Sequence, residues 1–275
     1  MIFVTVKGTK VPALGFGTWQ LTGAQCESAV EHALAVGYRH IDTAQAYGNE
    51  REVGRAIARS GVKRDAIFLT TKIAPDNLAA KDVTRSLAGS LDALGTDHVD
   101  LLLIHWPSKS VKMGETLRAM NEAKAQGKIK HIGVSNFTVA QMREAIETHG
   151  SEVFCNQIEY HVLLAQSRVI DFARAHDIMV TAYCPLARGR IADQPELVAI
   201  AKSHGKSVAQ IALRWLLQQD GVAAIPRSSK REHIAANFAV FDFTLSAEEL
   251  TTIGKLRGNT RVVSPSFAPV WDPPG

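Results

Sequence analysis

Cysteine is scarce in this sequence. The 275 residues include three cysteines, Cys26, Cys155 and Cys184, and no two of them form a CxxC pair. An odd and sparse set argues against a disulfide framework and is typical of proteins from a reducing compartment. The first ten residues, MIFVTVKGTK, lack the basic start and the long apolar stretch of a secretory signal. We therefore expect a cytoplasmic protein without disulfides.

Long apolar runs and a strong charge of either sign are also missing. No uncharged apolar run approaches the roughly 20 residues that a membrane-spanning helix needs. The formal net charge is only +4, and basic residues alternate with acidic ones along most of the chain. A protein that binds nucleic acid would usually carry a denser basic stripe. We expect a monomer with no membrane and no nucleic acid among its partners.

Eight short apolar runs alternate with stretches of helical period. The runs cover residues 14–18, 38–42, 66–72, 98–106, 129–136, 153–158, 178–183 and 222–226. The helical stretches cover 26–37, 49–61, 80–95, 114–127, 138–150, 165–177 and 195–221, and many of them end in Gly, as helices often do. A strand, a helix and a strand in this order indicate parallel pairing. Eight repeats predict an α/β fold of the (β/α)₈ TIM-barrel type.

The remaining segments fit one barrel domain over residues 1–275. The start, IFVTVKGTKVPAL, alternates around Lys7-Gly8-Thr9-Lys10 and predicts an N-terminal β-hairpin. The end, residues 262–275, is short and rich in proline, and predicts a C-terminal loop over the barrel mouth. A doubly wound sheet is the rival fold. It would open with a GxGxxG turn, whereas GFGTWQ lacks the third glycine.

Polar residues follow the apolar runs where the predicted strands end. Catalytic groups of such barrels lie at the C-terminal ends of the strands, so these residues should meet at one mouth. They are Asp42, Lys72, His105, Ser135, Asn136, Gln157, Tyr183, Arg227 and Ser228.

Three of these residues and Tyr47 suit the reduction of a carbonyl group. The carbonyl oxygen needs a proton as hydride arrives. Tyr47 can donate it, although a phenol with a pKa of about 10 is a poor donor. The ammonium of Lys72 favours the phenolate, and Asp42 can hold Lys72 in place and keep it charged. His105 can donate a hydrogen bond that orients the carbonyl.

A metal-dependent barrel hydrolase is a competing interpretation. His40 and Asp42 face the same way on a strand, and with Lys72 and His105 they could outline a metal site. A zinc site usually needs two or three converging His or Cys ligands, and a charged lysine is a poor ligand. We therefore expect no metal.

Eight segments of the sequence together resemble the aldo-keto reductases in their usual order. They are GFGTWQ, YRHIDTAQAYGNE, TTK, LIHWP, GKIKHIGVSNF, NQIEYH, AYCPLARGR and IPRSS. The length and the short connection after HWP are similar to the bacterial diketogluconate reductase-like branch. The resemblance implies a catalytic tetrad of Asp42, Tyr47, Lys72 and His105. It also implies NADPH, with NADH as an alternative cofactor, bound across the barrel mouth without a Rossmann fold.

The resemblance also implies a set of cofactor contacts. Ser135, Asn136 and Gln157 hold the carboxamide, and Tyr183 stacks on the nicotinamide. Arg188 lies near the pyrophosphate. Arg227 and Ser228 bind the 2′-phosphate, beside a short helix for which Ser229 and Glu232 have capping-box spacing. The full set is Thr18, Trp19, Asp42, Ser135, Asn136, Gln157, Tyr183, Pro185, Leu186, Arg188, Ile225, Arg227, Ser228, Ser229, His233 and Asn237.

The chain departs from the family in both halves of the expected site. His233 stands where the family usually has Arg, which weakens the expected preference for NADPH. On the substrate side Trp19 and Trp106 match the family's aromatic walls, and Phe267 and Trp271 in the C-terminal loop are the expected lid residues. Ala74 stands near a position where many members carry Trp.

The sequence thus predicts an enzyme that reduces aldehydes and ketones with NAD(P)H. A cofactor-binding regulatory subunit on the same barrel is the alternative from another class. The complete set of catalytic residues disfavours it.

Overall fold

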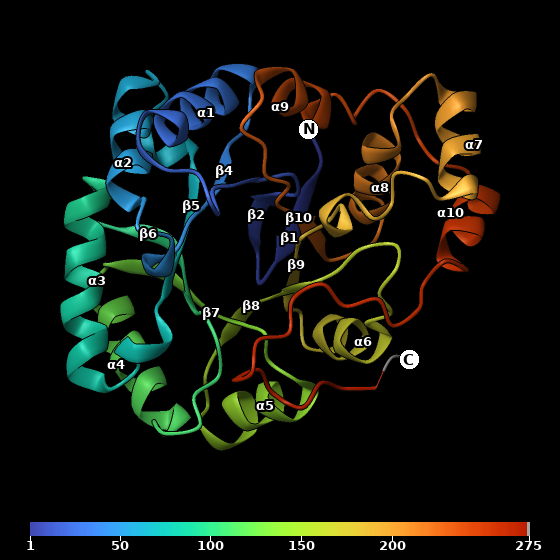
Figure 1. The fold of residues 1–275 in the computed structure, drawn as a ribbon. Helices are drawn as coiled ribbons and strands as arrows, with labels where there is room; N and C mark the ends of the chain where they lie inside the picture. The colour runs from blue at the N-terminus through green and yellow to red at the C-terminus, as the bar shows by residue number, and fades with distance from the viewer. Residues whose placement is uncertain (274–275) are drawn as a thin grey trace.

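The computed structural model describes residues 1–273 and confirms the α/β barrel (Figure 1). Eight parallel strands follow one another around the sheet in the order of the chain, from β3 to β10. The sheet closes because Leu14 and Ala224 form a parallel bridge across its two ends. A Cβ atom at Gly17 would lie 2.9 Å from the carbonyl oxygen of Ile225, so the backbones at this seam approach too closely for a side chain.

The barrel strands overlap the eight predicted apolar runs. Their side chains are almost all buried, as expected for a parallel sheet that is covered on both faces. The strands are β3 (Phe16–Gly17), β4 (His40–Asp42), β5 (Phe68–Ile73), β6 (Val99–Ile104), β7 (Ile129–Ser135), β8 (Val153–Glu159), β9 (Met179–Tyr183) and β10 (Val222–Ala224).

The helices surround the strands (Figure 1). They are α1 (Gly23–Val36), α2 (Glu50–Arg59), α3 (Ala80–Leu94), α4 (Met113–Ala125), α5 (Val139–Arg143), α6 (Ser167–Ala175), α7 (Pro195–His204), α8 (Val208–Leu217), α9 (Arg231–Phe238) and α10 (Ala247–Gly254). A π-helical turn over Glu144–Thr148 continues α5, and a short 3₁₀ turn over Gln45–Tyr47 follows β4. Capping boxes start α5, α8 and α10.

Two helix predictions differ from the structure. The sequence predicts one helical stretch over 195–221, but Gly205, with φ of +61°, ends α7, and a capping box at Ser207 starts α8. The capping box predicted for Ser229 and Glu232 is wrong. Lys230 is the N-cap of α9, and no side chain caps this helix.

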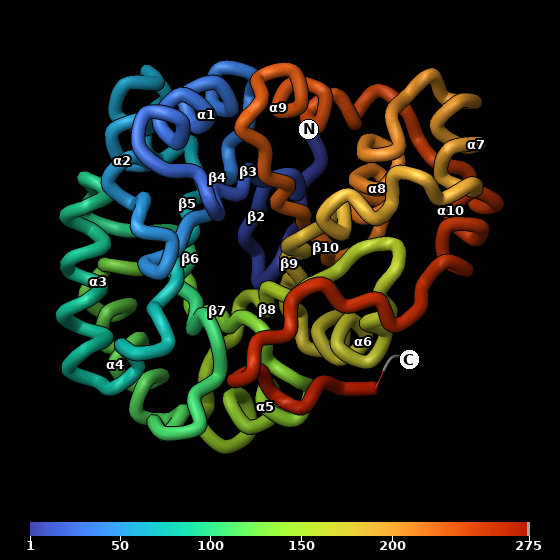
Figure 2. The backbone as a smooth tube through the Cα atoms, in the orientation of Figure 1, coloured from blue at the N-terminus to red at the C-terminus, as the bar shows by residue number. Residues whose placement is uncertain are grey.

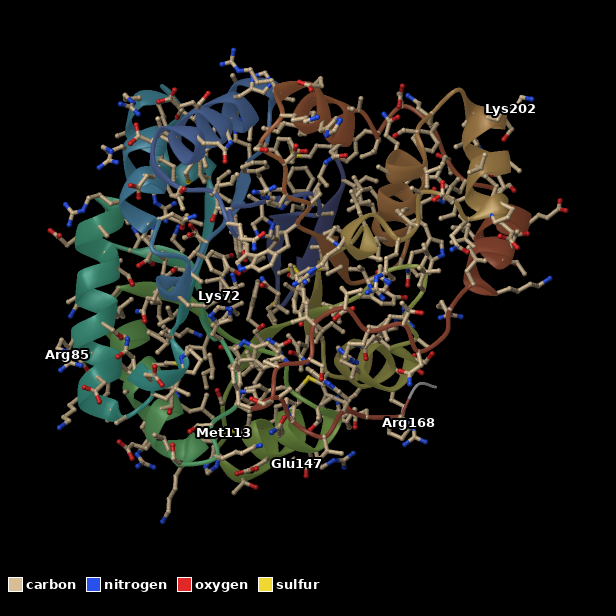
Figure 3. All side chains as sticks on the ribbon, viewed as in Figure 1. Lys72, Arg85, Met113, Glu147, Arg168 and Lys202 are labelled. Atoms are coloured by element: carbon tan, nitrogen blue, oxygen red, sulfur yellow. The ribbon has the colours of Figure 1, made fainter. Side chains whose placement is uncertain are left out.

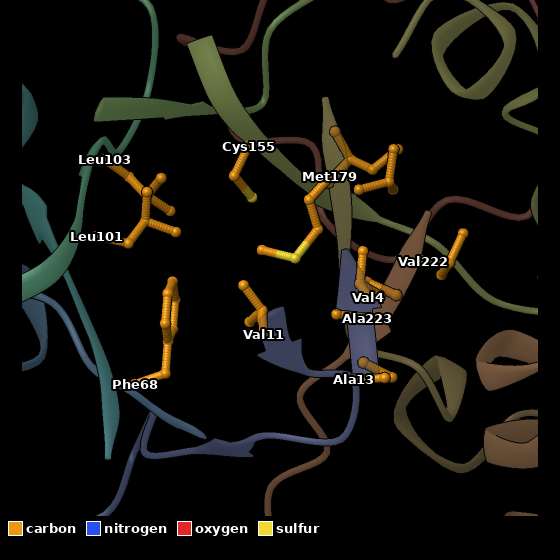
Figure 4. Close-up of a cluster of buried hydrophobic side chains, with 14 of the residues drawn as sticks. Val4, Val11, Ala13, Phe68, Leu101, Leu103, Cys155, Met179, Val222 and Ala223 are labelled. Atoms are coloured by element: carbon orange, nitrogen blue, oxygen red, sulfur yellow. The ribbon is translucent and has the colours of Figure 1, made fainter. Parts of the chain in front are cut away.

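The N-terminal hairpin is confirmed and covers the end of the barrel where the strands begin. β1 (Phe3–Val6) and β2 (Thr9–Pro12) pair antiparallel. Their inward side chains join an apolar cluster, shown in Figure 4, that includes Val4, Val11, Phe68, Leu101 and Met179. This packing fills the floor of the barrel with apolar side chains, including those of the hairpin.

The C-terminal segment is the predicted loop at the barrel mouth. Figure 2 shows it beside α5 and α6, which are distant in sequence. Just before it, Asn259 and Leu164 form an antiparallel bridge, and within it Val263 lines the cavity at the mouth. In the part of the chain that the structure describes, no helix has the length and hydropathy needed to cross a membrane.

Candidate active site

A cavity of about 680 Å³ opens where the strands finish. Its lining comes from the ends of β3, β4, β6, β7, β8, β9 and β10 and from Val263. Asp42, Tyr47 and His105 line this cavity. Lys72, fully buried on β5, lies near the centre of the ring of helices, whereas Arg85 lies at its outer edge (Figure 3). A smaller cavity of about 220 Å³, next to Pro107, contains none of these four residues.

Lys72 is surrounded by oxygen atoms. Its ammonium donates to Oδ1 of Asp42 at 2.6 Å, to the carbonyl of Thr43 at 2.7 Å and to the phenol oxygen of Tyr47 at 3.3 Å. The side chains of Lys72 and Asp42 are 0% and 1% exposed. A buried charge is costly unless it is paired and hydrogen-bonded, and here all three ammonium protons have acceptors. The arrangement fixes a positive charge beside the phenol.

The pKa values of Lys72 and Tyr47 follow from this burial and charge. Burial disfavours the ammonium of Lys72, but Asp42 and Tyr47 outweigh burial and raise the pKa of Lys72. Burial also raises the pKa of Tyr47, and the ammonium of Lys72 opposes this shift without reversing it. From the sequence we expect Lys72 to make the phenol easier to ionise, but burial has the larger effect. Tyr47 therefore keeps its proton at neutral pH, with Lys72 placed to stabilise the phenolate that donation would leave.

His105 is a neutral imidazole beside Tyr47. The two ring centroids are 5.7 Å apart. Burial, and then the charge of Lys72, lowers the pKa of His105 to about 3. Nδ1 of His105 is buried and has no partner within residues 1–273, so Nε2 is the nitrogen that can meet a molecule in the cavity. A neutral ring can donate one hydrogen bond, but it carries no spare proton for the reaction.

The turn that carries Tyr47 is held by the two residues that follow Gly48. Nδ2 of Asn49 donates to the carbonyls of Thr18 at 2.9 Å and Leu21 at 2.8 Å. The buried carboxylate of Glu50 accepts from Thr71 at 2.5 Å, next to Lys72 on β5. These bonds tie the turn after β4 to the loop after β3 and to β5. They fix the distance between the phenol and the ammonium, and sequence reasoning did not assign them this role.

Many of the residues predicted to bind a cofactor line one cavity. Gln157 donates to Oδ2 of Asp42 at 2.7 Å, and Ser135 donates to the carbonyl of Gln157 at 2.9 Å. This network joins the carboxylate of Asp42 to a polar edge of the cavity. The predicted residues in the lining are Thr18, Trp19, Asp42, Ser135, Gln157, Tyr183, Pro185, Leu186, Arg188, Ile225 and Arg227.

Other predicted residues lie outside the cavity lining. Asn136 is buried behind Tyr183, accepts its hydroxyl proton at 2.7 Å and donates to the carbonyl of His105 at 3.1 Å. It can therefore orient the Tyr183 ring. The remaining residues of this kind lie at or near α9 and are Ser228, Ser229, His233 and Asn237.

Two arginines border the side of the cavity where the sequence predicts the cofactor. The exposed guanidinium of Arg188 lies 5.0 Å from the ring centroid of Trp19, across the mouth. Arg227 donates to the carbonyls of Trp19 and Gln20, both at 3.1 Å. Both guanidinium groups thus lie at the rim of the cavity, where they are exposed.

The side of the cavity where the sequence predicts the substrate, which we call the substrate half, carries an aromatic group. Trp106 lines the cavity, and its outer side meets two rings of the C-terminal segment. The centroid of Phe267 is 5.3 Å away and that of Trp271 is 6.1 Å away, both in edge-on geometry. Trp271 itself lies outside the cavity lining, beneath the guanidinium of Arg261 at 3.9 Å. Trp271 therefore supports the wall that Trp106 forms.

Cys184 and Val263 are among the lining residues that the sequence did not assign to the site. Cys184 follows Tyr183 directly, and burial raises the pKa of its thiol. Its position after a strand end was the available signal. Val263 lies far along the chain in the C-terminal segment, and no local pattern points to it.

The ligand set of the competing metal site does not form. His40 places Nδ1 3.1 Å from the carbonyl of Pro12, away from His105. Among residues 1–273, no group of three or more His, Cys, Asp or Glu side chains could hold a metal ion.

Comparisons with known proteins agree with this geometry. The model of the "Aldo/keto reductase family" matches residues 13–257. The chain is 42% identical over 266 residues to "Methylglyoxal reductase DkgB" of Salmonella typhi, which covers 95% of this chain and 99% of that protein. It is 44% identical over 253 residues to an aldo-keto reductase of Mycobacterium tuberculosis, with 92% of this chain and 89% of that protein covered.

Solved structures show the same fold. A provisionally named 2,5-diketo-D-gluconic acid reductase B superimposes with a TM-score of 0.97 at 44% identity, over 99% of this chain and 98% of the other. An aldo/keto reductase from Brucella melitensis superimposes with a TM-score of 0.89 at 44% identity, over 92% of this chain and 97% of the other.

Proposed function

We propose, since this chain belongs to the aldo-keto reductase family, that it reduces aldehyde and ketone carbonyls with NADPH and that Tyr47 is the general acid. One observation carries the proposal. The ammonium of Lys72 lies within hydrogen-bond distance of both Asp42 and Tyr47, at a cavity that His105 also lines. A buried cation between a carboxylate and a phenol suits proton donation to an oxygen that gains negative charge.

The cavity fits a nicotinamide cofactor. Ser135 and Gln157 give one wall a polar edge, and Tyr183 offers a ring beside them. Arg188 and Arg227 border the exit with positive charge, which suits phosphate groups. When bound, the cofactor supplies the hydride. The size of the cavity, about 680 Å³, is in the range of sites that hold small molecules.

Four side chains of the protein orient the substrate and supply the proton. His105 is neutral and donates a hydrogen bond from Nε2 to the substrate oxygen, which orients the carbonyl. Tyr47 gives its proton to that oxygen as negative charge develops. Lys72 stabilises the phenolate that remains, and Asp42 holds Lys72 in place. His105 cannot replace Tyr47 as the acid, because with a pKa of about 3 it is unprotonated at neutral pH.

We expect small dicarbonyls such as methylglyoxal among the substrates. A relative that shares 42% of its residues with this chain is named methylglyoxal reductase. Aryl aldehydes should also fit, because Trp19 and Trp106 present aromatic surface to the cavity. The loss of one contact group in such a pocket costs about 1–3 kcal/mol, so discrimination between these classes should be weak.

Further expectations concern the choice between NADPH and NADH, the oligomeric state and the location of the protein. Arg227 remains as a partner for a 2′-phosphate, whereas His233 replaces the usual Arg. We therefore expect a preference for NADPH over NADH of roughly ten- to a hundredfold, from one charge-assisted contact. A single barrel domain, a monomer and a cytoplasmic location stay predictions.

A substrate panel tests the proposal. The purified protein is assayed with methylglyoxal, aryl aldehydes and keto-sugars, each with NADPH and with NADH, and the loss of reduced cofactor is recorded. We expect turnover of several carbonyls. Tight NADPH binding without turnover of any of them would contradict the proposal and favour the regulatory-subunit alternative.

A further inference from the structure

Glu159 is a buried carboxylate that the proposed reaction does not use. It ends β8, two residues after Gln157, and its side chain is 0% exposed. Oε1 accepts the amide proton of Val262 at 2.6 Å, and Oε2 accepts that of Val263 at 2.8 Å. Both oxygens of Glu159 thus bind the main chain of the C-terminal tail, which we define as residues 262–275.

His161 is a third hydrogen-bond partner of this carboxylate. Its Nε2 lies 3.0 Å from Oε1 of Glu159, and its Nδ1 accepts the amide of Leu163 at 3.3 Å. Because Nδ1 is an acceptor, Nε2 carries the proton and donates to Glu159. Hydrogen bonds to a charged acceptor are stronger than those between neutral groups. The amides of Val262 and Val263 and Nε2 of His161 can therefore hold the carboxylate in a position that solvent does not reach.

A short ladder leads into this anchor. Leu164 and Asn259 form an antiparallel bridge, and the amide of Ala165 donates to the carbonyl of Gly258 at 2.8 Å. The main-chain pairing between these segments ends before the tail begins. The amides of Val262 and Val263 follow, and they donate to the side chain of Glu159 instead of to backbone carbonyls.

The described far end of the tail has a second anchor. Oδ2 of Asp272 accepts the amide proton of Val139 at 2.9 Å, and Val139 is the first residue of α5. A carboxylate at the start of a helix is favourable, because the first amides there lack partners. Between the anchors, Phe267 and Trp271 pack on Trp106. Figure 1 shows the tail in red across α5.

We propose that Glu159 is a positioning residue that fixes the tail as a wall of the substrate half of the cavity. The inference rests on the proposed function, because it concerns the substrate of that reaction. Val263 lines the cavity beside its anchored amide, and Trp106 lines it with the tail packed behind. A small dicarbonyl held by Tyr47 and His105 does not need these contacts. A bulkier aryl aldehyde does, so Glu159 controls the size of the substrates that bind well.

Limited proteolysis tests the anchor without any enzyme assay. Trypsin can cut after Arg261, and the amide beyond that bond belongs to Val262. In Glu159→Gln one carboxylate oxygen becomes an amide NH₂ group, a donor that faces the N–H donor of the tail, so one anchor is lost. We expect release of residues 262–275 to become about tenfold faster, from the loss of one charge-assisted bond.

Asp100→Asn is the matched control, because it removes a buried carboxylate at the opposite end of the barrel. It should leave the release of the tail unchanged. Equal rates for Glu159→Gln and the wild type, or an equal acceleration in Asp100→Asn, would overturn the inference even in a protein that reduces no carbonyl.

Kinetics test the consequence for the substrate. In Glu159→Gln the ratio of kcat/KM for an aryl aldehyde to that for methylglyoxal should fall about tenfold, through KM, while the Kd of NADPH is unchanged. Deletion of residues 262–275 leaves Glu159 intact and should have the same effect. Adding Glu159→Gln to the deletion should change the ratio no further. A further fall in the double variant, or an equal loss of kcat for both substrates, would show that Glu159 acts otherwise.

Discussion

Two buried carboxylates lie at opposite ends of the barrel and use the same kind of partner. At the mouth, Asp42 on β4 accepts from Lys72 on the neighbouring strand β5 at 2.6 Å. At the floor, Asp100 on β6 accepts from Lys130 on the neighbouring strand β7 at 2.8 Å. The lysines differ in exposure, since the side chain of Lys72 is 0% exposed and that of Lys130 is 45% exposed.

The difference in exposure between the two lysines distinguishes an ion pair that only holds strands together from one that lies beside the cavity. Asp100 also pairs with Arg64 at 2.9 Å and accepts the amide of Leu69 at 3.0 Å, so every partner belongs to the floor itself. Lys72 cannot reach water, and its third hydrogen bond goes to Tyr47, which lines a cavity. The same type of ion pair holds neighbouring strands together at one end and, in the proposed reaction, places a charge beside the proton donor at the other.

The largest expected effect is at the mouth. Tyr47→Phe removes the acidic proton and should lower kcat by at least about 10²-fold, the low end for general acid catalysis. Cofactor affinity should stay nearly unchanged, as measured by fluorescence titration. Lys72→Met should also be severely impaired, because the phenolate then lacks its stabilising charge. A Phe variant that keeps most of its kcat would show that Tyr47 is not the acid.

The matching change at the floor should affect stability instead. Asp100→Asn leaves Lys130 and Arg64 without their anion, and the free energy of unfolding should fall by about 1–3 kcal/mol. The value lies below that of a fully buried pair because both cations reach solvent. Urea denaturation measures the loss. A large fall in kcat without a loss of stability would break the distinction between the two ends.

The pH dependence of stability sharpens the same comparison. Burial opposes the charge of Asp100, but Lys130 and Arg64 outweigh it and hold the pKa of Asp100 below its ordinary value. A lowered pKa in the folded state stabilises the protein above the unfolded pKa of about 4, and this contribution is lost as pH falls through the folded pKa. Unfolding of the wild type should therefore become easier below about pH 4. In Asp100→Asn that dependence should be weaker, and an identical acid profile would contradict the role of Asp100.

At the exposed rim of the mouth the expected effects are smaller. Arg227 is exposed, so water and salt screen its charge. Arg227→Ala should reduce the ratio of NADPH to NADH affinity by about tenfold, the value of one modest charge-assisted contact. Direct titration with both cofactors measures the ratio, and the affinity for NADH is the internal control. An equal loss for both cofactors would place Arg227 elsewhere than at the 2′-phosphate.

The smallest effect should come from His233. It is exposed on α9, outside the cavity lining. His233→Arg restores a permanent charge and should strengthen NADPH binding by about 1 kcal/mol, with no change for NADH. If both affinities stay the same, His233 does not face the 2′-phosphate.

Local patterns in the sequence were enough to predict most of the strands and helices of the barrel. Apolar runs identified the eight strands, and alternation around Lys7-Gly8 identified the hairpin. The polar residues after the strands could be expected to converge, because parallel strands finish at the same end. The positions at which helices begin and end were predicted less accurately. Gly205 ends a helix inside what reads as one periodic stretch, and Ser229 has the spacing of a cap without acting as one.

The sequence by itself determined which residue types reach the mouth, because period and strand ends are local properties of the chain. The tertiary structure alone decided how these residues act. Burial and the charge of Lys72 together make His105 neutral, whereas on Tyr47 burial outweighs that same charge and keeps the proton on the phenol. Glu159 meets Val262 across 103 positions of sequence, a distance at which no period or motif carries information. Contacts of that range follow only from the closure of the barrel, which brings the end of β8 and the tail to the same rim.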